Sequence, residues 1–183
     1  QSGFGVLIGD ASAELEVSGT GGSTTVYFVD GTLDVLTIDR TGETVGIVDI
    51  LSDPLEVNTL NLTNGTLDLS DQFFTVNTAY NAGGDFMVND ITTLTFGGST
   101  AGVLEFEATT TELGGLTLNT SGQISVEDAL TIYDVTVSSG GTLVNNAVVE
   151  FGTIENSGTF TLGADASVTG LFASADDAAI MNV

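Results

Sequence analysis

Carboxylates are nearly the only side chains of this sequence that could do chemistry, and three of them recur at one position of a repeated pattern. Asp34, Asp49 and Asp68 each stand between two apolar residues that follow a glycine. Side chains that alternate with the buried residues of a strand point outward. If successive repeats stack about 4.8 Å apart, the three carboxylates form a ladder, and a divalent cation would relieve their repulsion. The sequence therefore predicts a Ca²⁺ site at Asp34, Asp49 and Asp68, the alternative being a solvated acidic face screened by counterions.

The composition excludes most other chemistry. The 183 residues include 25 acidic side chains, one basic side chain (Arg40) and no His or Cys, for a formal net charge of −24. Without His and Cys the chain lacks ligands for structural zinc, haem and iron–sulfur groups, a thiol nucleophile and a Ser-His-Asp triad. One cation cannot neutralise a phosphate backbone, so no nucleic-acid partner is expected. No apolar stretch reaches the ~18 residues of a membrane span, so no membrane insertion is expected, and no cofactor other than Ca²⁺ is predicted.

Glycoside hydrolysis is the one catalytic chemistry that carboxylates alone support. The adjacent acidic pairs are Glu127/Asp128 and Asp176/Asp177. Neighbouring residues of a strand point to opposite faces, so neither pair has a catalytic geometry. The sequence therefore predicts a protein that is not an enzyme.

The elements that must position these carboxylates follow from an internal repeat. A pattern of glycine followed by alternating apolar residues begins at eight nearly evenly spaced glycines: Gly31, Gly46, Gly65, Gly84, Gly102, Gly122, Gly141 and Gly158. Within the unit that starts at Gly122, apolar residues occur in pairs separated by one residue: Ile124/Val126, Leu130/Ile132 and Val135/Val137. This period of two is typical of strands with one buried face. Three short strands per unit predict an all-β parallel β-helix, or β-solenoid, with about 19 residues per coil.

A β-sandwich or jelly roll is the alternative fold, because it also joins alternating strands by frequent turns. The repeat covers residues 31–170, the predicted solenoid. Residues 1–30 alternate like longer strands and are expected to form irregular strands that serve as a first coil, a cap or an assembly arm. Residues 171–183 are expected to form a C-terminal cap or tail.

Two runs carry a resemblance to a known group of proteins. Residues 55–69 and 138–143 are rich in Thr, Asn and Gly between apolar residues. In this texture the chain resembles the secreted β-solenoid surface-repeat proteins of bacteria, such as adhesins, autotransporter passengers and the Thr-, Asn- and Gly-rich surface proteins of Bacteroidota. The resemblance covers about residues 31–170 and implies an extracellular or cell-surface location.

Two hypotheses of function follow from a solenoid with open ends. End coils expose unpaired backbone groups, which are either capped or paired with another chain. The first hypothesis is a secreted, non-catalytic structural protein that self-assembles head to tail into an extracellular filament or surface layer, with residues 1–30 completing the sheet of the next copy. The alternative is a cell-surface adhesin or carbohydrate-binding module, stabilised by calcium, with surface glycans as partners. Tyr27, Tyr80 and Tyr133 are its candidate surface contacts, because most phenylalanines stand at inward positions.

Overall fold

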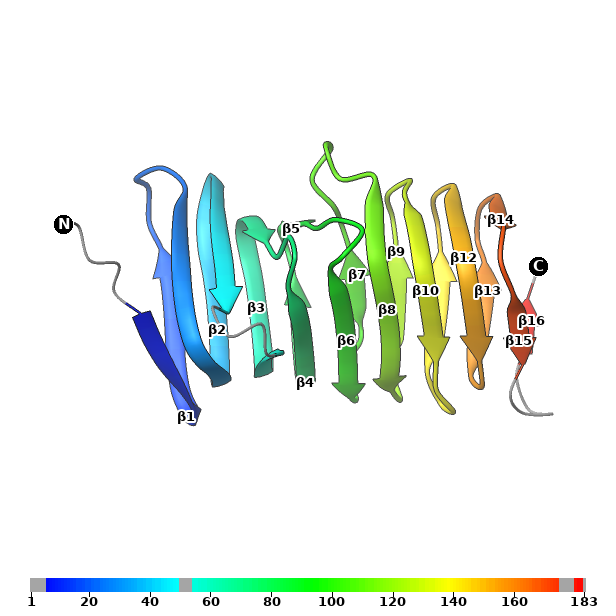
Figure 1. Cartoon of the computed structure of the whole chain (residues 1–183), viewed down its shortest axis with the longest axis horizontal. Helices are drawn as coiled ribbons and strands as arrows, with labels where there is room; N and C mark the ends of the chain where they lie inside the picture. Colours follow the sequence, from blue (N-terminus) through cyan, green and yellow to red (C-terminus); the bar gives the residue numbers. More distant parts are fainter. Residues whose placement is uncertain (1–5, 50–53, 175–179, 183) are drawn as a thin grey trace.

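The protein is an all-β parallel β-solenoid. A computed structural model describes residues 6–49, 54–174 and 180–182 (Figure 1). The chain makes about eight coils, and equivalent positions lie about 20 residues apart. The coils follow one another along the long axis, with the N-terminal coil at one end and the C-terminal coil at the other. The predicted fold class is therefore confirmed, and the β-sandwich alternative is wrong.

The described strands belong to two parallel sheets. The larger sheet has, in spatial order, β1 (Val6–Ser18), β2 (Thr24–Asp49), β3 (Leu55–Asp68), β4 (Phe73–Ala82), β6 (Thr93–Gly98), β8 (Glu112–Thr120), β10 (Thr131–Val137), β12 (Val149–Asn156) and β14 (Ala166–Val168). Off this path, β5 (Asp85–Met87) pairs with β3, and β15 (Phe172–Ser174) pairs with β12. The second sheet has the order β7 (Gly102–Leu104), β9 (Gln123–Val126), β11 (Thr142–Asn145), β13 (Thr159–Leu162) and β16 (Ile180–Asn182).

Some strands contribute to two walls of the coil, because their alternation of buried and exposed residues is interrupted once. In β10, the buried residues Ile132 and Val135 are separated by two exposed residues, Tyr133 and Asp134. Two outward residues in succession mean that the backbone bends, because a straight strand alternates strictly. The half-exposed residues 152 and 153 repeat this step in β12. In the unit that starts at Gly122, the three predicted short strands are thus observed as β9 and the two halves of β10.

The core is a set of apolar ladders that run along the solenoid axis. One ladder consists of residues that pair directly in successive coils: Leu55, Phe74, Leu94, Leu116, Val135 and Ile154. Each of these side chains is at most 1% exposed. The apolar pairs predicted between residues 124 and 137 are also buried. Burial of such a side chain stabilises the fold by ~1.5–3 kcal/mol, and every coil depends on its neighbours for it.

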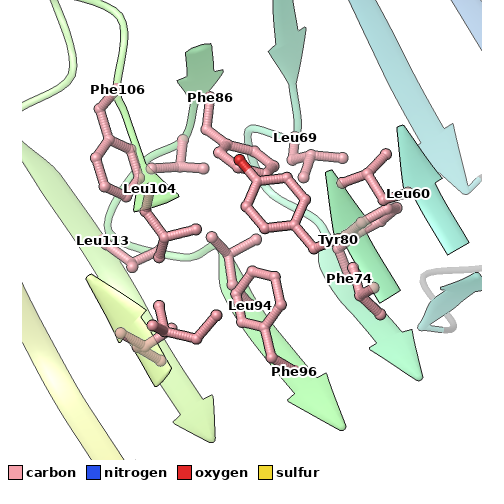
Figure 2. Close-up of a cluster of buried hydrophobic side chains, with 14 of the residues drawn as sticks. Leu60, Leu69, Phe74, Tyr80, Phe86, Leu94, Phe96, Leu104, Phe106 and Leu113 are labelled. Atoms are coloured by element: carbon pink, nitrogen blue, oxygen red, sulfur yellow. The ribbon is translucent and has the colours of Figure 1, made fainter. Parts of the chain in front are cut away.

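Aromatic side chains fill the middle of the core (Figure 2). The ring centroid of Tyr80 lies 5.7 Å from those of Phe86 and Phe96. The Tyr80 hydroxyl donates a hydrogen bond of 3.0 Å to the carbonyl oxygen of Val103, and burial raises its pKa. A Cβ atom at Gly102 would lie 2.7 Å from the Tyr80 ring, so only glycine fits beside it. The expectation that Tyr80 lies on the surface is wrong, because its ring completes this cluster.

Only some of the repeat glycines occupy equivalent positions in neighbouring coils. The register aligns five of them with another repeat glycine: Gly65 with Gly84, and Gly122 with Gly141 and Gly158. Gly46 instead pairs with Asp68, and Gly102 pairs with Ile124. Turns differ in length between coils, so a constant spacing in the sequence does not map onto a constant position in the fold.

Both terminal segments continue the parallel pairing. β1 lies in the segment 1–30 and pairs with β2, and β16 lies in the segment 171–183 and pairs with β13. The division of the chain at residues 31 and 170 stays a prediction. The part of the chain that the structure describes contains no helix that is long and apolar enough to span a membrane.

Candidate functional site

The structure does not stack Asp34 on Asp68. The amide Nδ2 of Asn58, in the next coil, donates a hydrogen bond of 3.0 Å to Asp34 Oδ1. Asp68 pairs with Gly46 and Met87, on the part of β3 beyond the corner at residue 65. The premise of the predicted calcium ladder is therefore wrong for this pair. The physical reason is coil length: Leu33, beside Asp34, pairs with Val57, 24 positions later, and not with Val48, which holds the equivalent position of the next predicted repeat.

The third predicted ligand adds no support for the calcium site. The side chain of Asp49 lies outside the described residues. Among the side chains that the structure does describe, no group of three or more carboxylates is arranged to hold a metal ion. Asp68 itself lines an open groove of about 490 Å³ together with neutral side chains such as Thr25, Tyr27 and Thr44.

Many of the outward carboxylates accept a hydrogen bond from a neutral side chain of the following coil. The pairs, with donor first, are Asn58–Asp34, Asn64–Asp39, Asn77–Glu56, Asn89–Asp71, Tyr133–Glu112 and Asn146–Glu127. In each pair the donor follows the acceptor by 18 to 25 residues, so the hydrogen bond joins neighbouring coils. Such bonds satisfy a carboxylate without a cation. Sequence reasoning missed this pattern, although an Asn about one coil after an acidic residue was a usable signal.

Arg40 serves the fold locally. Its guanidinium Nη2 donates a hydrogen bond to the carbonyl oxygen of Gly22, in the turn between β1 and β2. Its Nε atom is buried without a hydrogen-bond partner. The single cation of the sequence therefore fastens a turn to the first coils.

Carboxylates crowd one another in the middle of the molecule. Asp85 lines an open groove of about 350 Å³ that Glu107 also lines. Burial, then the charges of Glu107 and Asp128, raise the pKa of the Asp85 carboxyl. In this region carboxylates lie near other carboxylates, whereas in the pairs above each carboxylate accepts a hydrogen bond from a neutral donor.

A threonine ladder occupies one outward column and was not visible in the sequence. The register pairs four threonines of successive coils: Thr75, Thr95, Thr117 and Thr136. Their spacing in the sequence varies from 19 to 22 residues, which hides the column. Glu56 and Glu155 continue the column at its two ends. Cross-strand threonine pairs stabilise a sheet, and this column gives the acidic surface a neutral stripe.

The N-terminal end of the solenoid is an open sheet edge. β1 pairs with β2 on one side, and no described strand pairs with its other side. Val6, Leu7 and Ile8 are 40%, 41% and 78% exposed. Leu15 and Val17 pack against the core but are only partly buried. This edge therefore offers both unpaired backbone groups and apolar side chains.

The C-terminal end has the same character. Among the described strands, β14 and β15 pair only with β12, and β16 pairs only with β13. Leu162 and Ala166 are partly buried against the core, and Leu171 is 64% exposed. Because all these pairings are parallel, the two ends present complementary rows of backbone donors and acceptors.

Both ends also carry charge. β1 exposes Asp10, Glu14 and Glu16, and the last coils expose Glu150 and Glu155. Ser12 hydrogen-bonds to Asp10 through its hydroxyl and its backbone N–H, and these bonds lower the pKa of that carboxyl. Charges on edge strands oppose indiscriminate pairing.

Comparison with protein-family models, with curated proteins and with solved structures finds no match to this chain. The structure establishes the β-solenoid fold. Function is therefore inferred from the surfaces and ends of the solenoid.

Proposed function

We propose that this chain is a non-catalytic structural protein of the extracellular space or cell surface that associates head to tail with further copies of itself. The observation that carries the proposal is the pair of open ends, each with strands paired on one side and partly exposed apolar side chains. The texture shared with secreted bacterial surface-repeat proteins supports the location. The shortage of catalytic side chains supports a structural role.

The physical mechanism is addition of one more coil. The free edge of β1 in one copy would lie beside β14 and β15 of the preceding copy, in the parallel direction used throughout the solenoid. Leu15 and Val17 would then become fully buried, like the inward residues of the inner coils. A head-to-tail contact that does not close on itself produces a filament.

Charge sets the conditions for this contact. Glu14 and Glu16 would approach the acidic side chains of the last coils, and the chain has no second cation to pair with them. Salt weakens such repulsion within a Debye length of about 8 Å at physiological ionic strength. Association is therefore expected to strengthen as salt rises, and the acidic lateral faces keep filaments apart.

Two isoleucine variants test the proposal with the same change in chemistry. Ile8 is exposed on the end strand β1, and Ile91 is 55% exposed in the turn before β6, between the ends. Ile8→Glu should weaken self-association about tenfold or more, because it adds charge and removes apolar area at the joint. Ile91→Glu should leave it unchanged. Sedimentation velocity and negative-stain electron microscopy in about 0.5 M salt, where the Debye length is about 4 Å, measure both.

A protein that stays monomeric under these conditions at high concentration contradicts the proposal. Equal effects of the two substitutions contradict the end-to-end geometry. In the first case the alternative, a cell-surface adhesin or glycan-binding module, becomes the better hypothesis, and Tyr133 is an exposed aromatic side chain that favours it.

A further inference from the structure

Tyr133 stands alone at a corner of the solenoid wall. It lies in β10 at the bend between two walls, and its side chain is 41% exposed. The register places it opposite Gly114 in the preceding coil and Gly152 in the following coil. Neither neighbouring coil therefore places a side chain beside the ring at this position.

Only glycine fits at these two positions, because backbone carbonyl groups of the preceding coil lie too close for a Cβ atom. A Cβ atom at Gly114 would lie 2.5 Å from the carbonyl oxygen of Asp90 and 2.8 Å from that of Thr92. A Cβ atom at Gly152 would collide with the carbonyl group of Tyr133 itself. The lack of a side chain at these two positions opposite Tyr133 is thus fixed by the stacked coils.

Hydrogen bonding orients the ring. The Tyr133 hydroxyl donates a hydrogen bond of 2.8 Å to Glu112 Oε1 in the preceding coil. This bond, and after it burial and the negative charges of Glu112, Asp90 and Glu150, raise the pKa of the hydroxyl. A phenol that donates to a carboxylate keeps an electron-rich face.

The coils on both sides of Tyr133 carry a carboxylate near this corner. Glu112 and Glu150 both pair with Thr131, so they occupy the same outward position in the coils before and after Tyr133. The one basic residue of the chain, Arg40, lies in β2 and contacts the turn at Gly22. No cation of the same chain can therefore neutralise this corner.

We propose that Tyr133, Glu112 and Glu150 form a docking surface for a lysine or arginine side chain of a basic polypeptide partner. An ammonium or guanidinium group is attracted to the face of an aromatic ring and donates hydrogen bonds to carboxylates. Charge complementarity selects this occupant, because a net charge of −24 attracts basic chains and repels acidic ones. A neutral sugar stacks on the ring as well, but it gains nothing from the two charges.

Tyr133 and Glu112 lie on the lateral wall, and β14 and β15 cover the strand of Glu150, β12, on its C-terminal side, so the surface lies inside the ends that the proposed function uses. Its failure would therefore leave head-to-tail association untouched, and a monomeric protein can still carry it. One filament would display the corner once per copy.

The test is titration of the full chain with an oligolysine peptide, followed by calorimetry at low and at physiological ionic strength. Tyr133→Leu keeps the charge and should raise the Kd about tenfold, because the aromatic face is lost. Tyr133→Phe keeps the ring and should change the Kd less than about threefold. The double substitution Glu112→Gln/Glu150→Gln should weaken binding more than the matched double substitution Glu14→Gln/Glu16→Gln on β1.

Three results would overturn this assignment. An unchanged Kd in Tyr133→Leu, or equal effects of the two double substitutions, would mean that the peptide senses only the overall charge. Binding of an uncharged oligosaccharide that is lost in Tyr133→Leu, while oligolysine binding persists, would assign the corner to a sugar. Thermal unfolding of each variant confirms that the fold is retained.

Discussion

The N-terminal and C-terminal coils are built from the same kind of residues and differ in regularity. Between β8, β10 and β12, equivalent residues are spaced 19 apart and the register has no shift. Between β1 and β2 the register shifts at three places, and between β2 and β3 at two. Irregular turns and long strands therefore mark the first coils, and a strict coil marks the later ones.

The difference teaches that burial in a solenoid depends on having a coil on each side. Leu116, inside the regular region, is fully buried, whereas Leu15 in the end strand β1 is only partly buried. Both point inward in the same alternating pattern. The end coil is thus less stabilised by contacts, as expected for an element that opens locally.

The largest effect that tests this comparison is a pair of identical truncations. Leu116→Ala should lower the free energy of unfolding by about 2–5 kcal/mol, because it leaves a cavity in a closed core. Leu15→Ala should lower it by about 1 kcal/mol or less, because solvent already reaches that site. Urea unfolding followed by circular dichroism measures both values. Equal losses would mean that β1 is as well packed as the inner coils.

A smaller effect comes from adding one methyl group at a glycine of each region. In Gly152→Ala the new Cβ atom would meet the carbonyl of Tyr133, and we expect a loss of about 1–3 kcal/mol. In Gly21→Ala the nearest atom, Arg40 Nη2, lies 3.6 Å from the new Cβ position, which is ordinary contact. The melting temperature should therefore fall only for Gly152→Ala. A fall of the same size for Gly21→Ala would show that the N-terminal turn is packed as closely as the regular coils.

The smallest effect concerns Asp85, which lies among other carboxylates between the irregular first coils and the regular later coils. Its pKa is raised in the folded protein, so the folded state holds the proton more tightly than the unfolded state does. The stability contributed by that proton is present below the ordinary aspartate pKa of about 4 and is lost as the pH rises through the folded pKa. Asp85→Asn should therefore raise the melting temperature at pH 7, and the gain should shrink as the pH falls toward 4. A gain that stays constant with pH would contradict the charge crowding around Asp85.

The sequence predicted the coil better than it predicted the surface. Ile124, Val126 and Leu130 were assigned inward by their period of two, and all three are buried. That signal is local, because alternation is a property of each strand by itself. The stacking of Asp34 and Asp68 depended instead on the length of every turn between them, which one sequence does not fix.

The surface columns show the same limit. Thr75 and Thr95 stack although no constant spacing marks the threonine ladder. Tyr80 and Tyr133 follow similar local patterns, yet the first is buried beside Gly102 and the second is exposed between two glycines. Which residue of the neighbouring coil faces a given tyrosine is decided by the register alone.

By itself, the sequence determined the walls of the solenoid, the absence of His, Cys and Lys, and the acidic character of its faces. Only the tertiary structure decided which carboxylate meets an asparagine, which meets another carboxylate and which tyrosine reaches solvent. The physical reason is that strand alternation is set by neighbours in the chain. Contacts between coils are set by register, which accumulates the length of every intervening turn.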